Sequence, residues 1–315
     1  MKVPGPYEAT VLADSTAYGT RLTTLAVTFP RIVLAEFNTH RVFSRNSASS
    51  RAIPVRRRIE QIRANPYVPL SFGKNKRGMQ AKGEEVAHAE AAREHWLHAM
   101  QQACDRAESL ATLGLHKQWA NRIIEPYAWH TVIVSATEWD NYFAQRDSPN
   151  AQPEIAKASE AMRAAMEAST PKELQPGQWH LPCIGGKDWR TQGMFGDVYD
   201  ELVRISVARC AAISYGRIPD NDLEADLKRY ERMRSMFHMS PFEHAAEVHS
   251  PTGTVEFEYV GEVHEFEMPF GPTYRRGPVD GIPRWIFNGY FCGNFRAPWV
   301  QHRKMIAGEF CYEGE

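Results

Sequence analysis

The stretch from Phe37 to Arg51 constrains this chain more than any other part of its sequence. Its fifteen residues include three arginines, one histidine, two asparagines and four serines, which is too polar a composition for a hydrophobic core. The stretch also lacks the glycine and proline that are typical of turns and plain linkers. Planar guanidinium groups suit phosphate oxygens, and closely spaced small residues let backbone N–H groups approach an anion. The stretch is therefore either a solvated basic loop or an anion-binding segment.

Hydrophobic periodicity along the rest of the chain predicts an α+β fold. Strands are expected at residues 10–14, 22–29 and 255–259, and helices at 54–64, 83–113, 115–124, 154–167, 195–215 and 221–237. A short helix beginning at Pro30 is expected to carry His40 and Arg41 on its last turn, with Arg45 and Arg51 in the turn that follows. A loop is expected at residues 66–78, and it is either a lid over a charged ligand or an ordinary surface loop.

Composition excludes several classes of protein. The chain has 315 residues and a formal net charge of −1, so no global field draws it to nucleic acid or to a membrane. It has no apolar run of membrane-spanning length and no signal-peptide core near Met1, which predicts a cytoplasmic protein. The five scattered cysteines form no C-x-x-C pair, and we expect Cys183 to be a buried small residue rather than a nucleophile. No histidine spacing matches a zinc motif, so no metal site is predicted.

The order of residues in the opening stretch resembles the signature of the flavin-dependent thymidylate synthases. That signature reads Arg-His-Arg, two residues, Ser, one residue, Asn-Glu, one residue, Ser, one residue, Arg. Six positions match it in register, namely His40, Arg41, Ser44, Asn46, Ser49 and Arg51. Thr39 replaces the first arginine and Ser47 replaces the glutamate, as in a divergent member of the kind found in bacteriophage genomes, where the host cytoplasm is the expected location.

Further segments strengthen this resemblance. Residues 121–126 are similar to the family's Ala-Arg-x-x-Leu-Pro, and residues 137–146 are similar to its Arg-Ser-Leu-x-Asn-Phe-x-x-x-Arg. Residues 238–244 look like the His-x-Ser/Thr-Pro-x-Glu-His segment that contacts the flavin and that ordinarily precedes the signature. Residues 294–303 look like a worn second copy of the Gln-x-x-Arg-His-Arg region.

The resemblance implies two α/β halves, each an antiparallel or mixed sheet packed with long helices, in a rearranged internal duplication. Residues 1–170 would form the nucleotide- and flavin-binding half, residues 171–194 a linker, and residues 195–315 a second, degenerate half with the Ser-Pro-Phe-Glu-His segment. The family is a homotetramer with active sites between subunits, so a homodimer or homotetramer is expected.

The function that the resemblance implies is methylation of dUMP at C5 to give dTMP, without a cysteine nucleophile. Side chains cannot supply hydride, and the implied cofactors are FAD, NADPH and 5,10-methylenetetrahydrofolate. Because Glu36 and Ser47 depart from the family's residues, one alternative is a hydroxymethylase that acts on dUMP or dCMP for phage DNA. Another alternative is a non-catalytic protein that binds nucleotides or nucleic acid.

The resemblance assigns roles to residues of this chain by their position in the family's motifs. The catalytic residues are expected to be Arg146, Ser49 and His238. Substrate binding is expected of Glu36, Ser47, Ala48, Ser49, Ser50, Arg51, Arg122 and Arg146. Cofactor binding is expected of Thr39, His40, Arg41, Ser44, Asn46, Asn141, Ser240 and Glu243.

Overall fold

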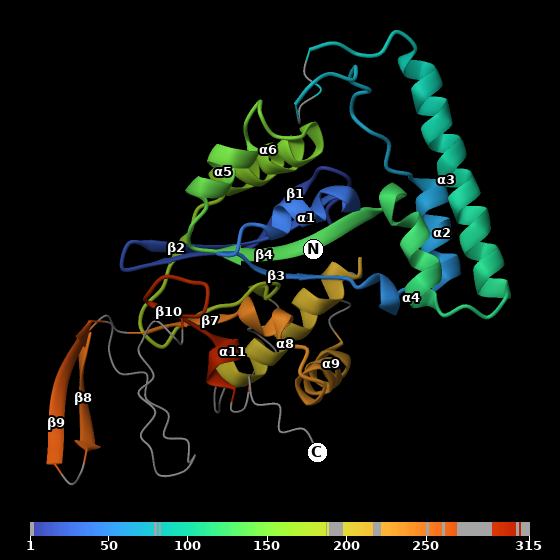
Figure 1. Ribbon diagram of the computed structural model, residues 1–315. Coiled ribbons are helices and arrows are strands. Elements are labelled where there is room, and N and C mark those ends of the chain that lie inside the picture. The colour runs from blue at the N-terminus through green and yellow to red at the C-terminus, as the bar shows by residue number, and fades with distance from the viewer. Residues whose placement is uncertain are drawn as a thin grey trace.

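A mixed five-stranded sheet organises the computed structural model of the chain (Figure 1). The structure describes residues 3–78, 81, 83–186, 188, 198–216, 222–249, 252–259, 262–269, 292–306 and 309, with backbone alone at 198–199, 252–259 and 262–269. The strands are β1 (Ala9–Ala17), β2 (Thr20–Pro30), β3 (Ser44–Ser47), β4 (Trp129–Ala136) and β5 (Lys172–Glu173), in the order β3-β4-β2-β1-β5. Only the β1–β5 pair is parallel. The sheet and its helices confirm the α+β class.

Helices cover one face of the sheet, drawn above it in Figure 1. They are α1 (Leu34–Asn38), which follows the 3-10 turn η1 (Arg31–Val33), and α5 (Asp140–Arg146) with α6 (Pro153–Glu167). Apolar side chains of β2 and β4, such as Leu25 and Val134, meet Phe37 and Met162 in one buried cluster. Burying such side chains fully contributes about 1.5–3 kcal/mol each, so this cluster fixes where α1 and α5 place their polar residues.

The second half of the chain covers the opposite face. Helix α8 (Val198–Ser214) packs Cys210 and Ile213 against Ala26 and Ile133 of the sheet. Beside it lie α9 (Leu223–Ser235), the 3-10 turn η4 (Ser240–Glu243), α11 (His302–Met305) and a small sheet of β6 (Trp179–His180), β7 (Ala246–Val248) and β10 (Trp299–Gln301). Strands β8 (Thr252–Tyr259) and β9 (Glu262–Pro269) form a hairpin. The two halves therefore share one sheet as their common support.

A helical layer closes one end of the sheet, at the right of Figure 1. It consists of η2 (Ser50–Ala52), α2 (Val55–Ala64), α3 (Ala89–Thr112), α4 (Lys117–Ala120) and η3 (Asn121–Tyr127). Ile59 and Ile62 of α2 pack against Met100 and Cys104 of α3, and the two helices confirm the helices predicted within 54–64 and 83–113. No helix in the described parts of the chain has the length and apolar character that crossing a membrane requires.

The structure corrects three local predictions. Helix α1 ends at Asn38, so His40 and Arg41 follow it instead of forming its last turn. The residues after them form edge strand β3, not a turn, because their backbone pairs with β4. Residues 179–180 lie in the predicted linker, yet they pair with β7 as β6. The described residues hold one five-stranded sheet and no second copy of it, so internal duplication and the domain bounds stay predictions.

A buried cation joins α8 to its neighbours. Arg209 is 3% exposed and donates to Asp226 (Nε to Oδ2, 2.9 Å) and to the Cys183 carbonyl (3.1 Å), and it pairs with Asp188. Changing Arg209 to Met is expected to lower the free energy of unfolding by about 2–3 kcal/mol, below the ~3–5 kcal/mol of a fully orphaned buried charge, because Arg229 still pairs with Asp226. Urea unfolding measures the loss, and Arg204→Met, at a half-exposed ion pair, is the control. Equal midpoints for the two variants would contradict this role.

Candidate active site

Strand β3 divides the signature stretch into two ends that lie in different surroundings. Residues 36–43 precede it, and the rings of Phe37 and His40 pack against Tyr142 of α5. Ser49, Ser50 and Arg51 follow it, and η2 contacts η3. The strand itself is covered by η4 and α8 from the second half of the chain. The predicted site residues consequently fall into three groups.

The first group, the Arg146 cluster, consists of Glu36, Thr39, His40 and Arg146. Arg146 donates from Nε to His40 Nε2 (3.0 Å), and from Nη2 to Thr39 Oγ1 (3.2 Å) and to the Glu36 carbonyl (3.4 Å). Burial lowers the pKa of His40, and the charges of Arg146 and Arg45 lower it further. The imidazole is therefore neutral with its proton on Nδ1, since Nε2 accepts from Arg146.

A cavity of about 880 Å³ adjoins this cluster. Four of the residues predicted to bind the cofactor, Thr39, His40, Arg41 and Asn141, line it together. Its walls also carry Arg21, Arg163 and Arg296, which were not among the predicted site residues. These three arginines pair with Asp14, Asp147 and Glu138 respectively. Arg41 makes no side-chain hydrogen bond or ion pair with any described residue, so its guanidinium is available to an anionic ligand.

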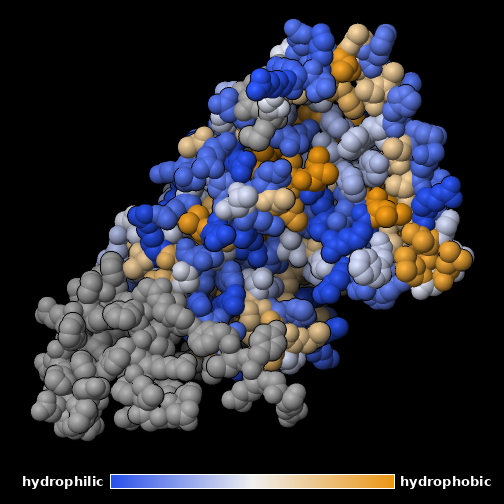
Figure 2. Space-filling model, viewed as in Figure 1, coloured by the Kyte–Doolittle hydropathy of each residue, from blue (hydrophilic) through white to orange (hydrophobic). Residues whose placement is uncertain are grey.

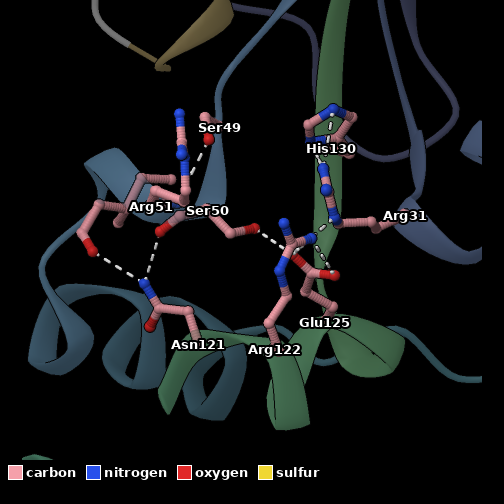
Figure 3. Close-up of polar contacts among 9 residues, drawn as sticks. Arg31, Ser49, Ser50, Arg51, Asn121, Arg122, Glu125 and His130 are labelled. Carbon is pink, nitrogen blue, oxygen red and sulfur yellow. Dashed lines mark hydrogen bonds and ion pairs between the residues drawn. The ribbon is translucent and has the colours of Figure 1, made fainter. Parts of the chain in front are cut away.

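The second group, the Glu125 cluster, lies at the other end of β3 (Figure 3). The carboxylate of Glu125 accepts a hydrogen bond from Ser50 and pairs with Arg122 (3.0 Å) and Arg31 (3.2 Å). Asn121, fully buried, donates to the carbonyls of Ser50 and Ile53 at 2.8 Å each. Ser49 Oγ accepts from the backbone N–H of Arg51 (3.3 Å), whose side chain is exposed. These bonds hold the loop after β3 against η3 and bring Ser50, Arg51 and Arg122 into one region.

The third group lies inside the contact between the two halves. Ser44 Oγ accepts from Gln301 (2.8 Å), and Asn46 Oδ1 accepts from His244 Nε2 (2.6 Å). Glu243 pairs with Arg303. The structure does not place Ser44, Asn46, Ser240 or Glu243 on the wall of the 880 Å³ cavity. The Ser-Pro-Phe-Glu-His segment thus meets the signature strand within a single chain.

The remaining predicted residues are dispersed. His238, expected to be catalytic, is exposed and lies outside all three groups, with its backbone N–H bonded to Met233. Ser47 is half-buried in β3, and Ala48 is buried. No contact among the described residues joins Arg146 to Arg51 or Arg122, so one chain presents the predicted arginines at two separate places. Cys183 is buried as predicted.

The fold and these groups define an α+β protein with an arginine-rich cavity beside its central sheet. Residues 20–172 match the family model described as thymidylate synthase complementing protein. The matched segment contains the signature and both supporting motifs of the first half. The resemblance inferred from the motifs is therefore confirmed.

Other comparisons are weaker. No curated protein sequence matches the chain. Among solved structures, the UMP/dUMP methylase PolB from Streptomyces cacaoi bound with 5-Br UMP is 14% identical, with a TM-score of 0.43 over 52% of this chain and 91% of that one. The same enzyme bound with 5-Br dUMP is 16% identical, with a TM-score of 0.38 over 46% of this chain and 65% of that one.

Proposed function

We propose that the chain is an enzyme that converts dUMP to dTMP with FAD, NADPH and 5,10-methylenetetrahydrofolate. One observation carries the proposal: Thr39, His40, Arg41 and Asn141, from two motifs about a hundred residues apart in the sequence, line a single cavity. A solvated basic loop gives no reason for these positions to converge. The match of residues 20–172 to the family supports the same reaction class.

The volume and the polar lining of the cavity support a flavin dinucleotide as its ligand. Its volume of about 880 Å³ lies within the range of roughly 300–1,000 Å³ of known ligand sites. The unpaired guanidinium of Arg41 suits a pyrophosphate oxygen, and Asn141 offers an amide. When bound, the flavin supplies the reducing equivalents that no side chain has.

The chain's own residues bind and orient. Arg146 is assigned to the negative charge that develops on the uracil carbonyls, and its bond to His40 fixes that ring against the cavity. One such donor contributes about 3–4 kcal/mol to transition-state stabilisation. Arg51 and Arg122, with the backbone of residues 47–50, are assigned to the phosphate end of the nucleotide, with Ser49 offering its hydroxyl close to the reacting base.

A complete site of this kind needs two copies of the chain, because Arg146 and Arg51 lie in separate clusters. Exposed apolar residues beside Arg122 support an association: Leu113 is 83% exposed, Trp119 60% and Ile123 40%. Figure 2 shows a group of hydrophobic side chains at the lower right, where α3 ends. We therefore assign the active site to the boundary between subunits of a homodimer or homotetramer, as the family resemblance implies.

A second candidate function is modification of dCMP, including hydroxymethylation. It is favoured by Glu36, whose Oε2 is buried and has no hydrogen-bond partner among the described residues. A carboxylate oxygen accepts from the exocyclic amino group of cytosine, whereas the carbonyl at the same place in uracil repels it.

One assay separates these functions. The purified chain is expected to show a flavin absorbance band and to form dTMP from dUMP when folate donor and NADPH are supplied, with products weighed by mass spectrometry. A product from dCMP alone would favour the second candidate. Arg41→Met is expected to lower bound flavin several-fold, and Arg106→Met, on the exposed face of α3, is the matched control. A colourless protein that turns over neither nucleotide would refute both functions.

A further inference from the structure

A second cavity lies apart from the 880 Å³ cavity. It has a volume of about 310 Å³ and is enclosed by α2, the beginning of β4 and the end of α8. Arg57, Arg58 and Gln61 line it from α2, Trp129 and His130 from β4, and Tyr215 from the turn after α8. Residues 57, 58, 61 and 65 recur at helical spacing, so one face of α2 is turned toward the space.

Arg58 is the unusual member of this set. Arg58 is only 8% exposed, yet its guanidinium makes no hydrogen bond or ion pair with any residue that the structure describes. Buried cations in proteins are normally paired, because an unpaired charge loses its hydration without compensation. Arg57, exposed on the same helix turn, has no such partner in the described chain either.

The surroundings do not neutralise Arg58. Among the described residues, the carboxylate that acts on it is that of Glu125, which already pairs with Arg31 and Arg122 and accepts from Ser50. His130 is 3% exposed, and burial together with the charges of Arg31 and Arg58 lowers its pKa to about 3. The imidazole is therefore neutral and supplies no negative charge to Arg58. The C-terminal end of α8 contributes about half an elementary negative charge at most. Among the residues that the structure describes, the cavity therefore has an excess of positive charge.

We propose that this cavity binds the phosphate group of a phosphorylated small molecule through Arg57 and Arg58. Guanidinium groups from two consecutive residues in the first turn of a helix, both lining one cavity, suit the several oxygens of a phosphate. The amides of Gln61 and Asn65 and the rings of Trp129 and Tyr215 provide polar and apolar walls for the body of such a ligand. Neither Arg51 nor Arg122 lines the cavity, so this anion is distinct from the nucleotide phosphate assigned to them.

The test uses the full chain and inorganic phosphate. In phosphate-free buffer, adding phosphate at about 100 times its Kd is expected to raise the Tm by about 4 °C. Potassium chloride at equal ionic strength controls for screening. Arg58→Met is expected to lose the phosphate-dependent shift, because the buried charge is gone. Arg56→Met, an exposed neighbour that does not line the cavity, is expected to keep it.

Two more variants keep the proposal open to refutation. Arg51→Met removes the guanidinium assigned to the substrate and is expected to leave the phosphate shift intact. Arg57→Met, at an exposed position that tolerates change, is expected to weaken phosphate binding at least tenfold in calorimetry, whether or not Arg58→Met folds. The proposal is wrong if the wild-type chain shows no phosphate-dependent shift, if Arg58→Met responds like the wild type, or if Arg51→Met abolishes the response.

Discussion

Replacing Arg146 with methionine is expected to lower kcat for the proposed nucleotide reaction by roughly 10²–10³-fold, the effect of removing one preorganised donor from a transition state. Arg146 bonds His40, Thr39 and the Glu36 carbonyl at once. Methionine removes its charge and also releases the imidazole that lines the cavity. Steady-state rates of product formation, measured with bound flavin quantified separately, check the result.

The conservative variant separates charge from geometry. Lysine at position 146 keeps the cation but has no planar fork, so it cannot make the three contacts of the guanidinium together. Arg146→Lys is expected to fall between the wild type and Arg146→Met in kcat, and the exposed Arg106→Met to match the wild type. If Arg146→Met keeps kcat within about threefold of the wild type, far from the ~10²–10³-fold loss of an electrostatic donor, Arg146 does not act on the reaction.

The sequence predicted the helices well because their signal is local. The apolar stripes of α2 and α6 repeat within each helix and need no partner to be visible. Strand β4 was missed, although it is central to the sheet. Its polar residues His130, Thr131 and Ser135 interrupt the alternation that marks a strand, and they are satisfied only by partners far away in the chain, such as Arg31 and Thr28.

The order of residues in the sequence located part of the site, but it did not reveal that the site residues fall into separate clusters. The signature motif identified His40 and Arg51 by their spacing, and four cofactor positions did converge on one cavity. His40 and Arg51 lie in different clusters because edge strand β3 stands between them. This strand forms because its backbone pairs with β4. Arg296 was not foreseen as a cavity residue, because it is brought beside Glu138 only by the packing of the second half onto the first. Contacts between residues so far apart in the chain leave no periodic pattern in the sequence.

Six buried polar side chains form a continuous chain of hydrogen bonds across the sheet and into the second half. In order they are Ser15, His180, Thr24, Ser135, His244 and Asn46, with successive distances of 2.9, 2.8, 2.6, 2.8 and 2.6 Å. Both histidines are fully buried. Burial lowers the pKa of each to about 3, and His180 lowers that of His244 further. Each imidazole is therefore neutral, and each uses both ring nitrogens to join the two halves.

This network predicts that the protein is destabilised by acid. The pKa of these histidines is lower in the folded chain than the ~6.5 of an unfolded one, so below pH 6.5 the unfolded state binds more protons and the free energy of unfolding falls. At pH 5 the loss is about 2 kcal/mol for each histidine. With His130, whose pKa burial also lowers to about 3, the total is about 6 kcal/mol. The stability is fully present above pH 6.5.

Urea unfolding at pH 7.5 and pH 5 measures this loss, and one substitution assigns it. Glutamine at position 244 offers an amide donor and acceptor but does not titrate, so His244→Gln is expected to remove about a third of the pH dependence, about 2 kcal/mol, while costing stability at pH 7.5. His98→Gln, on the exposed surface of α3, is expected to leave the pH dependence unchanged. An unfolding free energy that stays constant between the two pH values would show that His180 and His244 accept protons inside the fold, and that the hydrogen-bond chain between the halves does not depend on neutral imidazoles.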